Sequence, residues 1–460
     1  MADSKYNPKQ TLIEQYSSAL VIGLGLTGYS VVRYLLAQGL KVQVLDSRAM
    51  PPLAEKLNKE YPHIECHFGP FDTAEKEQVS LVVVSPGVDL KQPFFQKVKT
   101  QGAHIVGDIQ LFVEQNTQPL IAITGSNGKS TVTTLVGAIC DSAGMNSLVA
   151  GNIGLPVLDA LTDNVNYDIA ILELSSFQLE TTSNLQADAA AILNISPDHM
   201  DRYSSMGDYV LAKSRILRGA KTVVLPRHDN QLRQISYSGE LLSFDLDEPA
   251  NDSEFGVRQT TNYRWLMQAN QKYMRLSQIP LTGLHNIKNV LAAFALVAFL
   301  KLPLEKLVSA VKSFKGLPHR MQTVLIENDV TWVNDSKATN IGATSSALKN
   351  LKENIIWIAG GEGKGADFNE LKDAITDKIK LLIVLGEDAD KIELALKGLL
   401  PIKRVESMQE AVQLALKSAL KGSIVLLSPA CASLDMYENF ERRGDDFAYQ
   451  VKQCVTRGAA

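Results

Sequence analysis

Apolar and polar positions alternate in blocks along the chain, and short apolar runs that end in Gly, Asp or Pro recur throughout it. The first block contains "ALVIGLG" (residues 19–25), "KVQVLDS" (41–47) and "LVVVSPG" (81–87), with helical patterns between them. Continuous apolar runs of this length are typical of buried parallel strands. The pattern therefore predicts strands that alternate with helices.

Two further blocks repeat this theme. One runs through "PLIAITG", "YDIAILELSS", "AAAILNIS" and "KTVVLP", and the other through "IIWIAGG", "LLIVLGED" and "SIVLLSPA". Between about residues 229 and 278 the sequence is polar and dotted with aromatic residues, which predicts a small antiparallel sheet. We expect an α/β protein of three domains, each with a parallel sheet. The predicted domains are residues 1–107, 108–316 and 317–460, the first and third Rossmann-like and the central one similar to P-loop ATPases.

Composition agrees with this plan. The 460 residues, at ~150 per domain, suffice for three domains, and 45% hydrophobic with 21% charged residues is ordinary for a soluble globular protein. A net charge of -4 and a pI near 6.0 argue against a broad nucleic-acid surface, so we expect no nucleic-acid partner. The four cysteines are scattered without a C-x-x-C pair, which indicates neither a disulfide framework nor a zinc site and fits the cytoplasm.

No stretch of the sequence predicts a membrane segment. Residues 1–18 are polar and lack the apolar core of a signal peptide. The longest apolar run, "VLAAFALVAFL" (290–300), is too short to span a bilayer and is followed by Lys301. We expect it to form a buried helix.

The first glycine loop, "GLGLTG", has the G-x-G-x-x-G spacing at Gly23, Gly25 and Gly28, after a strand and before a helix. A bare backbone and a helix N-terminus accept a diphosphate closely. Asp46 ends the next strand, where a ribose-binding acid is expected, and Arg48 could meet a second phosphate or a ribose edge. A dinucleotide, another nucleotide diphosphate, or a tight turn without ligand all remain open on this pattern.

The second glycine loop, "TGSNGKST", is too short for the Walker A pattern, because Ile123 stands where its first glycine should be. Its spacing alone favours a nucleotide site and a chance match about equally. An apolar strand precedes it and a helix follows. Loop amides would then face an anion, Lys129 would reach the outer phosphates, and Ser130 or Thr131 could hold Mg²⁺.

Three neighbouring features favour a nucleotide site. Glu173 ends the apolar strand before "LSSFQL", and "SPDHMDRY" places Asp198, His199 and Asp201 in the turn after another strand. Carboxyl ends of parallel strands line the ligand crevice, so Glu173 and His199 are candidate ligands, although Mg²⁺ prefers oxygen to imidazole. A salt-bridged Glu and a packed His remain alternatives. Lys213 is predicted on the first helical turns that follow, where a lysine is ordinarily a solvated surface residue.

Together these residues resemble the Mur ligase family, the ATP-dependent amide ligases of peptidoglycan precursor synthesis, with which cell shape and division are associated. "TGSNGKST" is similar to that family's shortened P-loop. "GNIG", "ELSSFQL", "NISPDHMDRY", "LTGLHNIKNVLAA", "GLPHRMQ", "NDSKATN" and "SPACASLDMYENFERRGDDF" occur in the family's order. "GLGLTG", "NDSKATN", "GGEGKGADF" and "SLDMYENF" resemble the branch that adds D-glutamate to UDP-N-acetylmuramoyl-L-alanine.

The resemblance implies a reaction and its participants. ATP phosphorylates the terminal carboxyl of UDP-MurNAc-L-Ala, and the amine of D-glutamate attacks the acyl phosphate. The implied cofactors are ATP and Mg²⁺ at two sites, with Mn²⁺ as an alternative. The expected protein is a cytoplasmic monomer.

The resemblance also implies a role for individual residues. The catalytic set is Lys129, Lys213, His199, Glu173 and Arg320. Metal ligands are Ser130, Thr131, Glu173, His199 and Lys213, the last as a carbamate. ATP contacts are Gly125, Ser126, Asn127, Gly128, Lys129, Ser130, Thr131, Asn286, Asn289, Arg320 and Asp335. Contacts to UDP-MurNAc-L-Ala are Leu26, Thr27, Ser47, Arg48, Ser85, Pro86, Gly87, Asn152, His199 and His319. The D-glutamate pocket is Lys337, Thr339, Lys364, Ser433, Leu434 and Phe440, which supply the cation and polar donors that a dicarboxylate needs.

Two further expectations concern single segments. Gln110 stands where the family usually has Glu, which leaves the polar contacts of that side chain open. Residues 315–318 are the predicted hinge about which the third domain closes.

Three other functions fit parts of the sequence. A folylpolyglutamate synthetase-type ligase would lack a UDP-binding first domain, whereas this chain has "GLGLTG" ahead of the P-loop. An NAD-dependent oxidoreductase built on that loop would leave the P-loop, Glu173 and His199 without a purpose. A nucleotide-regulated scaffold protein would bind ATP without turning over a small acid.

Overall fold

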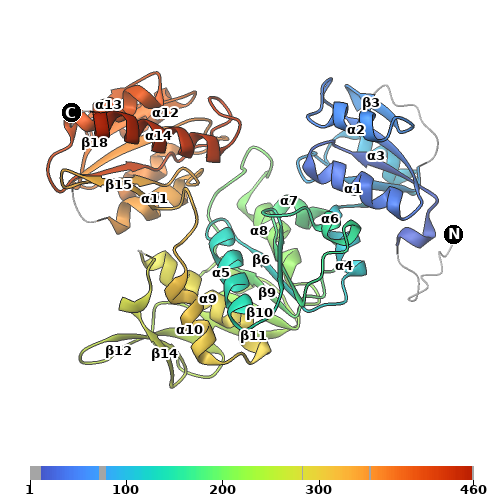
Figure 1. Cartoon of the computed structure of the whole chain (residues 1–460), viewed down its shortest axis with the longest axis horizontal. Helices are drawn as coiled ribbons and strands as arrows, with labels where there is room; N and C mark the ends of the chain where they lie inside the picture. Colours follow the sequence, from blue (N-terminus) through green and yellow to red (C-terminus); the bar gives the residue numbers. More distant parts are fainter. Residues whose placement is uncertain (1–11, 72–78, 282, 352–353, 458–460) are drawn as a thin grey trace.

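Three β-sheets, each covered by helices, follow one another along the chain (Figure 1). The computed structural model describes residues 12–71, 79–281, 283–351 and 354–457, so the outermost residues of the polar N-terminal stretch lie outside it. The predicted α/β class with parallel sheets is confirmed. The central part lies between the first and third parts, which sit at opposite sides of the molecule (Figure 1).

The first sheet is parallel throughout and has the order β3-β2-β1-β4-β5. Its strands are β1 (Ser18–Ile22), β2 (Lys41–Asp46), β3 (Glu65–Phe68), β4 (Leu81–Val84) and β5 (His104–Val106). The accompanying helices are α1 (Leu26–Ala37), α2 (Ala54–Glu60) and α3 (Pro93–Thr100), and α4 (Asp108–Gln115) leads to the central part. Strands β2 and β3 follow on one side of β1, and β4 and β5 on the other. Such a change in strand order is a topological switch point, which opens a crevice at the carboxyl ends of the strands.

The central sheet has nine strands in the order β14-β13-β12-β11-β10-β9-β6-β8-β7. They are β6 (Leu120–Thr124), β7 (Ser147–Gly151), β8 (Ile169–Glu173), β9 (Ala189–Ile192), β10 (Thr222–Pro226), β11 (Glu240–Phe244), β12 (Glu254–Gln259), β13 (Arg264–Gln268) and β14 (Gln271–Arg275). The antiparallel pairing predicted within residues 229–278 is present between β12, β13 and β14, but these strands do not form a sheet of their own. β11 pairs parallel with β10, and the antiparallel β12–β14 extend the same sheet, because backbone pairing continues across the polar stretch.

Six α-helices among the described central residues cover this sheet. They are α5 (Lys129–Ser142), α6 (Val157–Thr162), α7 (Ser176–Glu180), α8 (Met206–Ser214), α9 (Leu284–Val297) and α10 (Leu304–Ser313). The predicted buried apolar helix is confirmed for residues 290–297 of α9, whereas residues 298–300 form a 3₁₀ turn that is only partly buried. The placement of Lys213 on the first helical turns is wrong, because it lies in the last turn of α8, pointing into the core.

The third sheet has the order β15-β16-β20-β17-β18-β19 and is parallel except for β15. Its elements are β15 (Gln322–Glu327), β16 (Val330–Asn334), α11 (Ile341–Asn350), β17 (Ile355–Gly360), β18 (Ile379–Leu385), α12 (Ala389–Leu396), β19 (Ile402–Arg404), α13 (Met408–Ser418), β20 (Ile424–Leu427) and α14 (Phe440–Arg457). Short 3₁₀ helices elsewhere are Ile13–Gln15, Arg215–Leu217, Leu232–Gln234, Leu276–Gln278, Ala298–Leu300 and Phe368–Ala374. Trp332 on β16 and Trp357 on β17 are fully buried in the core of the third part.

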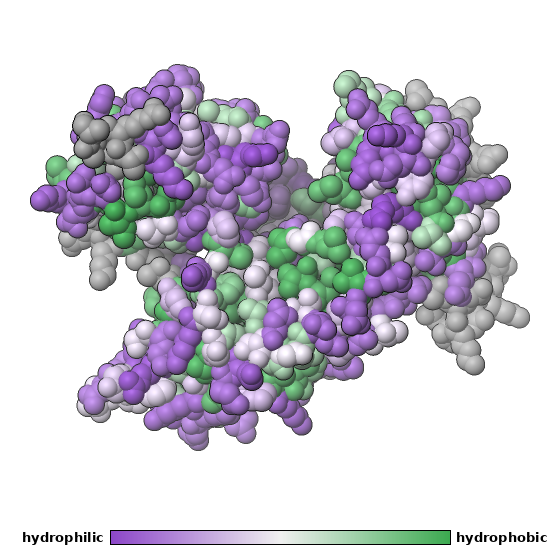
Figure 2. Space-filling view, viewed as in Figure 1, coloured by the Kyte–Doolittle hydropathy of each residue, from purple (hydrophilic) through white to green (hydrophobic). Residues whose placement is uncertain are grey.

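The surface is hollowed between the first and third parts, and hydrophobic side chains gather on the central part below this hollow (Figure 2). Most of the remaining visible surface is hydrophilic (Figure 2). Within the described ranges no helix combines the length and the apolar character that crossing a bilayer requires.

Candidate active site

A cavity of about 690 Å³ lies at the carboxyl ends of β1, β2 and β4. The structure brings most of the predicted UDP contacts to it, namely Leu26, Thr27, Ser47, Arg48, Ser85, Pro86, Gly87 and Asn152. His199 and His319 are not among the residues that line it.

Glycine is required at two positions of the loop that borders this cavity. A Cβ on Gly28 would lie 1.8 Å from the carbonyl oxygen of Gly23, and Gly23 itself has a φ of 92°. Asp46 accepts hydrogen bonds from the Leu24 amide at 2.7 Å and from the Arg48 guanidinium at 2.6 Å. Its other oxygen accepts from the amide and the Nε of Arg48, both at 2.9 Å, so Asp46 holds the loop and Arg48 with both carboxylate oxygens engaged.

The P-loop joins β6 to α5, which begins at Lys129. Gly128 caps the helix with a φ of 83°, and a Cβ there would lie 2.6 Å from the side-chain oxygen of Asn289. A cavity of about 470 Å³ opens beside the loop, and predicted ATP contacts that line it are Asn127, Gly128, Thr131, Asn286, Asn289, Arg320 and Asp335. Gly125, Ser126, Lys129 and Ser130 belong to the same loop but do not line this cavity. The compact loop is thus built for close packing against α9.

Three basic side chains of the predicted site converge on the P-loop. The Lys129 ammonium donates to the carbonyl oxygens of Gly125 at 2.9 Å and Ser126 at 3.1 Å, and the Lys213 ammonium donates to Gly125 at 3.0 Å. The Arg320 guanidinium donates to the hydroxyl of Ser130 at 2.7 Å. Burial lowers the pKa of each of the three, most strongly for Lys213. Lys129 and Arg320 therefore place basic groups where the sequence predicts phosphates, whereas burial favours the neutral amine of Lys213.

Glu173 presents a buried carboxylate at the end of β8. One of its oxygens accepts a hydrogen bond from the Asn152 amide at 2.8 Å. The other oxygen is buried and has no hydrogen-bond partner among the residues of the four described ranges. A buried carboxylate oxygen without a donor is costly, and a cation would satisfy it.

His199 occupies a left-handed backbone conformation with a φ of 57°, which is uncommon outside glycine. Its ring packs edge-on against Phe177, with 4.8 Å between the ring centroids, and lies 3.7 Å from the Asp198 carboxylate. Burial lowers the pKa of His199 to about 4, although Asp198 opposes this shift. The imidazole is therefore neutral near pH 7 and able to bind a metal ion.

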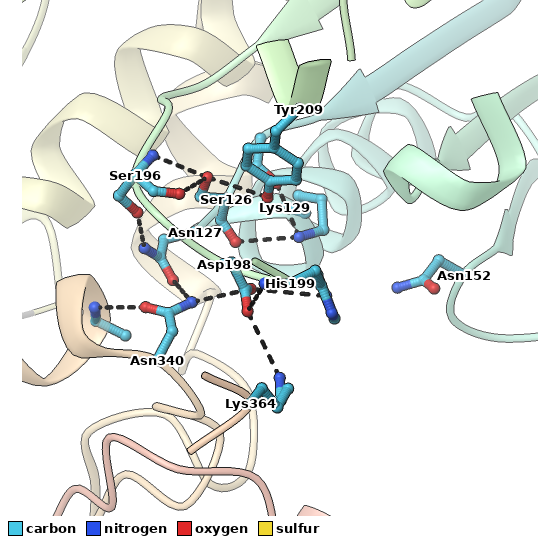
Figure 3. Close-up of polar contacts among 12 residues, drawn as sticks. Ser126, Asn127, Lys129, Asn152, Ser196, Asp198, His199, Tyr209, Asn340 and Lys364 are labelled. Carbon is cyan, nitrogen blue, oxygen red and sulfur yellow. Dashed lines mark hydrogen bonds and ion pairs between the residues drawn. The ribbon is translucent and has the colours of Figure 1, made fainter. Parts of the chain in front are cut away.

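Two residues of the third part, Asn340 and Lys364, make polar contacts with the central part beside the P-loop (Figure 3). Lys364 lies 3.5 Å from the Asp198 carboxylate, and the Asn340 amide donates to Asp198 at 3.2 Å and to Asn127 at 3.3 Å. A cavity of about 250 Å³ beside these contacts includes His199, Thr339 and Lys364 in its lining. Asn152 lies apart from the other labelled residues (Figure 3).

The remaining predicted D-glutamate contacts are scattered. The Lys337 ammonium lies 3.7 Å from the centroid of the Phe440 ring. Lys337 also lines the cavity of about 470 Å³ beside the P-loop. Ser433 is buried, Leu434 is exposed, and neither lines any of the three cavities. His319 is buried in the third part, where its ring nitrogen lies 3.1 Å from the Asn334 amide. The structure does not bring His319 to the cavity at the carboxyl ends of β1, β2 and β4.

Sequence reasoning missed several residues that shape the site. Asn340 caps α11 through its side-chain oxygen, which leaves its amide nitrogen for the contacts described above. Asp198 was recognised in its motif but was given no function. Arg443 is buried and donates to backbone carbonyls in three loops of the third part, those of Ser336, of Gly360, and of Cys431 and Ala432. The position of Asn340 directly before a predicted helix could have identified it as a helix cap. The burial of Arg443 depends on tertiary packing and has no local signal in the sequence.

No group of three or more His, Cys, Asp or Glu side chains in the described parts of the chain is arranged to hold a metal. The predicted ligand set contains only two such side chains, Glu173 and His199, beside Lys213 and two hydroxyls. The unsatisfied oxygen of Glu173 fits a cation at this place.

Comparison with known proteins gives a consistent result over most of the chain. The family described as "Mur ligase MurD-like, N-terminal domain" matches residues 17–107, "Mur ligase middle domain" matches 123–297, and "Mur ligase, glutamate ligase domain" matches 319–431. A UDP-N-acetylmuramoylalanine–D-glutamate ligase of Methylobacillus flagellatus is 45% identical over 437 residues, which cover 94% of this chain and 96% of the relative. The chain belongs to the Mur ligase family.

Other Mur ligases agree in sequence and in fold. An enzyme of the same name from Pseudomonas aeruginosa is 42% identical over 448 residues, 96% of this chain and 99% of its own. The solved UDP-N-acetylmuramate-alanine ligase of Thermotoga maritima shares the fold with a TM-score of 0.59 at 17% identity, covering 95% of this Mur ligase and 100% of that chain. A pseudomurein peptide ligase of Methanothermus fervidus gives 0.59 at 19% identity, with 90% and 96% covered. Family membership rules out the oxidoreductase reading of the first glycine loop.

Proposed function

We propose that this Mur ligase joins D-glutamate to UDP-MurNAc-L-Ala at the expense of ATP, in peptidoglycan precursor synthesis. The observation that carries the proposal is the convergence of Lys129, Lys213 and Arg320 on one P-loop, beside the buried carboxylate of Glu173. The relatives named for this reaction, at 42–45% identity, support the choice of substrates.

The chemistry explains why the site needs these residue types. A carboxylate is a poor acylating agent, so an oxygen of the alanyl carboxylate first attacks the γ-phosphorus of ATP, and ADP leaves. The amine of D-glutamate then attacks the acyl carbon, and phosphate departs with that oxygen. Two anions must approach each other in the first step, and Lys129 and Arg320 lower its barrier by neutralising their charge.

Mg²⁺ fits the site at two places. Ser130 and Thr131 would hold it at the phosphates, and Glu173 with His199 and Lys213 would hold it near the acceptor. Bound there, the ion supplies charge neutralisation for phosphoryl transfer. Burial favours the neutral amine of Lys213, and a neutral amine is the form that adds carbon dioxide to become a carbamate, which supports the proposed modification. Mn²⁺ is the alternative ion.

We propose further assignments that follow from this function. UDP-MurNAc-L-Ala binds the cavity of the first domain (1–107), ATP the central domain (108–316), and D-glutamate the third domain (317–460). Lys364, Thr339 and Lys337 bind the D-glutamate carboxylates, with Ser433, Leu434 and Phe440 around them. The enzyme acts as a cytoplasmic monomer.

The test is phosphate release from Mg-ATP with each substrate supplied singly and with both together. We expect release only with both UDP-MurNAc-L-Ala and D-glutamate, with one product amide formed per phosphate. Release with a folate and L-glutamate instead would contradict the substrate assignment, and release with neither would contradict the ligase.

A second test concerns Lys213. We expect K213A to lose at least ~100-fold in turnover, and added short carboxylic acids to restore part of it by replacing the carbamate. The matched control is Lys221→Ala, which removes an exposed lysine of the same domain. Equal loss in both variants would contradict a specific role for Lys213.

Closure of the third domain about residues 315–318 is also proposed, because the D-glutamate contacts lie on a different sheet from the P-loop. Small-angle scattering with and without ADP, Mg²⁺ and both substrates should show a change in the radius of gyration. Unchanged dimensions would contradict the hinge.

A further inference from the structure

The nucleotide cavity runs along the carboxyl ends of neighbouring strands in the central sheet. The P-loop follows β6, and β9, β10 and β11 lie next in order (Figure 1). Strands are spaced about 4.8 Å apart, so the end of β11 lies roughly 14 Å from the end of β6. Gly128 and Thr131 line the cavity near the P-loop, and Phe244 and Asp245 line it at the end of β11. A nucleotide with its phosphates on the P-loop would therefore direct its base toward β11.

Asp245, directly after β11, presents an unsatisfied acceptor at this end. Its Oδ1 accepts from the Lys288 ammonium at 2.7 Å and from the Leu246 amide at 2.8 Å. Its Oδ2 is buried and has no hydrogen-bond partner within the described part of the chain, and the residue is only 5% exposed. Lys288 lines the same cavity from the first turns of α9.

The two purines differ in the hydrogen-bonding groups along their edges. Adenine carries an amino group, a donor, beside ring nitrogens that accept, whereas guanine carries an oxygen at the corresponding position. A carboxylate oxygen attracts the amino group of adenine and repels the oxygen of guanine. We propose that Asp245 accepts a hydrogen bond from the exocyclic amino group of adenine while Lys288 donates to a neighbouring ring nitrogen, so that the pair selects ATP over GTP. This inference rests on the proposed function, in which the cavity holds a nucleoside triphosphate.

The geometry of Asp245 makes D245N an informative variant. The two donors at Oδ1, Lys288 and the Leu246 amide, would hold the oxygen of the new side chain in place. Its amide nitrogen would then occupy the position of Oδ2 and present a donor to the base. A donor at this position opposes the adenine amino group and complements the guanine oxygen.

The experiment measures kcat/KM for ATP and for GTP in phosphate release, with both acid and amine substrates present. We expect D245N to lose about 10- to 100-fold with ATP while GTP turnover is unchanged or rises. The matched control is D247N, which removes the same charge two residues further on, at a half-exposed side chain outside the cavity that pairs with Arg227. K288M gives a second measurement and should lower ATP turnover without raising GTP turnover.

The outcomes separate the inference from the proposed function. An unchanged ratio of ATP to GTP turnover in D245N and in K288M, from an enzyme that uses ATP, overturns the assignment of Asp245 and Lys288 alone. An unmodified enzyme that turns over no nucleoside triphosphate overturns the proposed function and this inference with it. A fall of the ratio in D245N but not in D247N supports the assignment.

Discussion

The central part contacts the first part and the third part through different kinds of residue. Toward the first part, Arg33 forms ion pairs at 2.6 Å with both Asp159 and Asp163. Arg202 pairs with Glu180 at 2.9 Å and donates to backbone carbonyls of the first part. None of these five side chains belongs to the predicted site.

Toward the third part, the contacts are made largely by site residues. Arg320 donates to Ser130, Lys364 lies beside Asp198, and Asn340 bridges Asp198 and the P-loop. Phosphate and metal would compete for Ser130, and D-glutamate would compete for Lys364. The difference is consistent with a first junction that acts as a structural support, and the proposed function predicts that the second is remade when substrates bind.

The largest effect that separates the junctions is expected from Arg320→Ala. Loss of this cation should lower kcat/KM about 10³-fold, because it removes charge stabilisation of phosphoryl transfer. Thermal stability should change little, since the lost hydrogen bond to Ser130 and the lost attraction to Glu173 and Asp335 are offset by removing a charge that burial disfavours. Steady-state phosphate release and a melting curve measure the two effects. A large fall in melting temperature with nearly normal turnover would reverse the assignment of this junction.

The opposite result is expected from Arg202→Met at the first junction. The variant leaves the Glu180 carboxylate, which is only 18% exposed, without its ion-pair partner. We expect a cost of about 2 kcal/mol, or roughly 4–8 °C in melting temperature, with turnover reduced less than about tenfold. Differential scanning calorimetry provides the check. A variant that melts at the same temperature as the unmodified protein would show that the Arg202–Glu180 contact does not stabilise the fold.

A pH effect is expected at the second junction, through Asp335. Burial raises the pKa of this carboxyl to about 7, above its value in the unfolded chain. A raised pKa in the folded state stabilises the fold fully below about pH 4, and this contribution is lost as the pH rises through about 7. D335N should therefore gain melting temperature relative to the unmodified protein between pH 5.5 and pH 8. The same difference at both pH values would contradict the shift.

The smallest effect concerns Gln110, near the first junction. Its side-chain oxygen accepts from the Ser183 amide and hydroxyl, both at 2.9 Å, and its amide donates to Glu114 at 2.8 Å. Gln110→Glu would place two carboxylates together and should cost about 1 kcal/mol with unchanged turnover. Urea titration measures the cost, and a stabilised variant would show that Glu114 is not the relevant neighbour.

Sequence alone predicted the parallel sheets, both glycine loops and the position of Glu173 at the end of a strand, because strand ends and loop spacing are local signals. It did not predict that β11–β14 join the central sheet, since pairing between distant strands has no local signature. Lys213 was placed in the wrong turn because its burial depends on the helix packing around it. His319 and Leu434 show the same limit, because a motif identifies neighbours in sequence and not the surface that a side chain faces.

The most direct test of the ligase reaction follows an oxygen atom. UDP-MurNAc-L-Ala labelled with ¹⁸O in its alanyl carboxylate is incubated with ATP, Mg²⁺ and D-glutamate, and the released phosphate is analysed by mass spectrometry. Activation of the carboxylate by phosphoryl transfer predicts one labelled oxygen in each phosphate released. Phosphate without label would contradict the proposal that ATP phosphorylates the alanyl carboxylate.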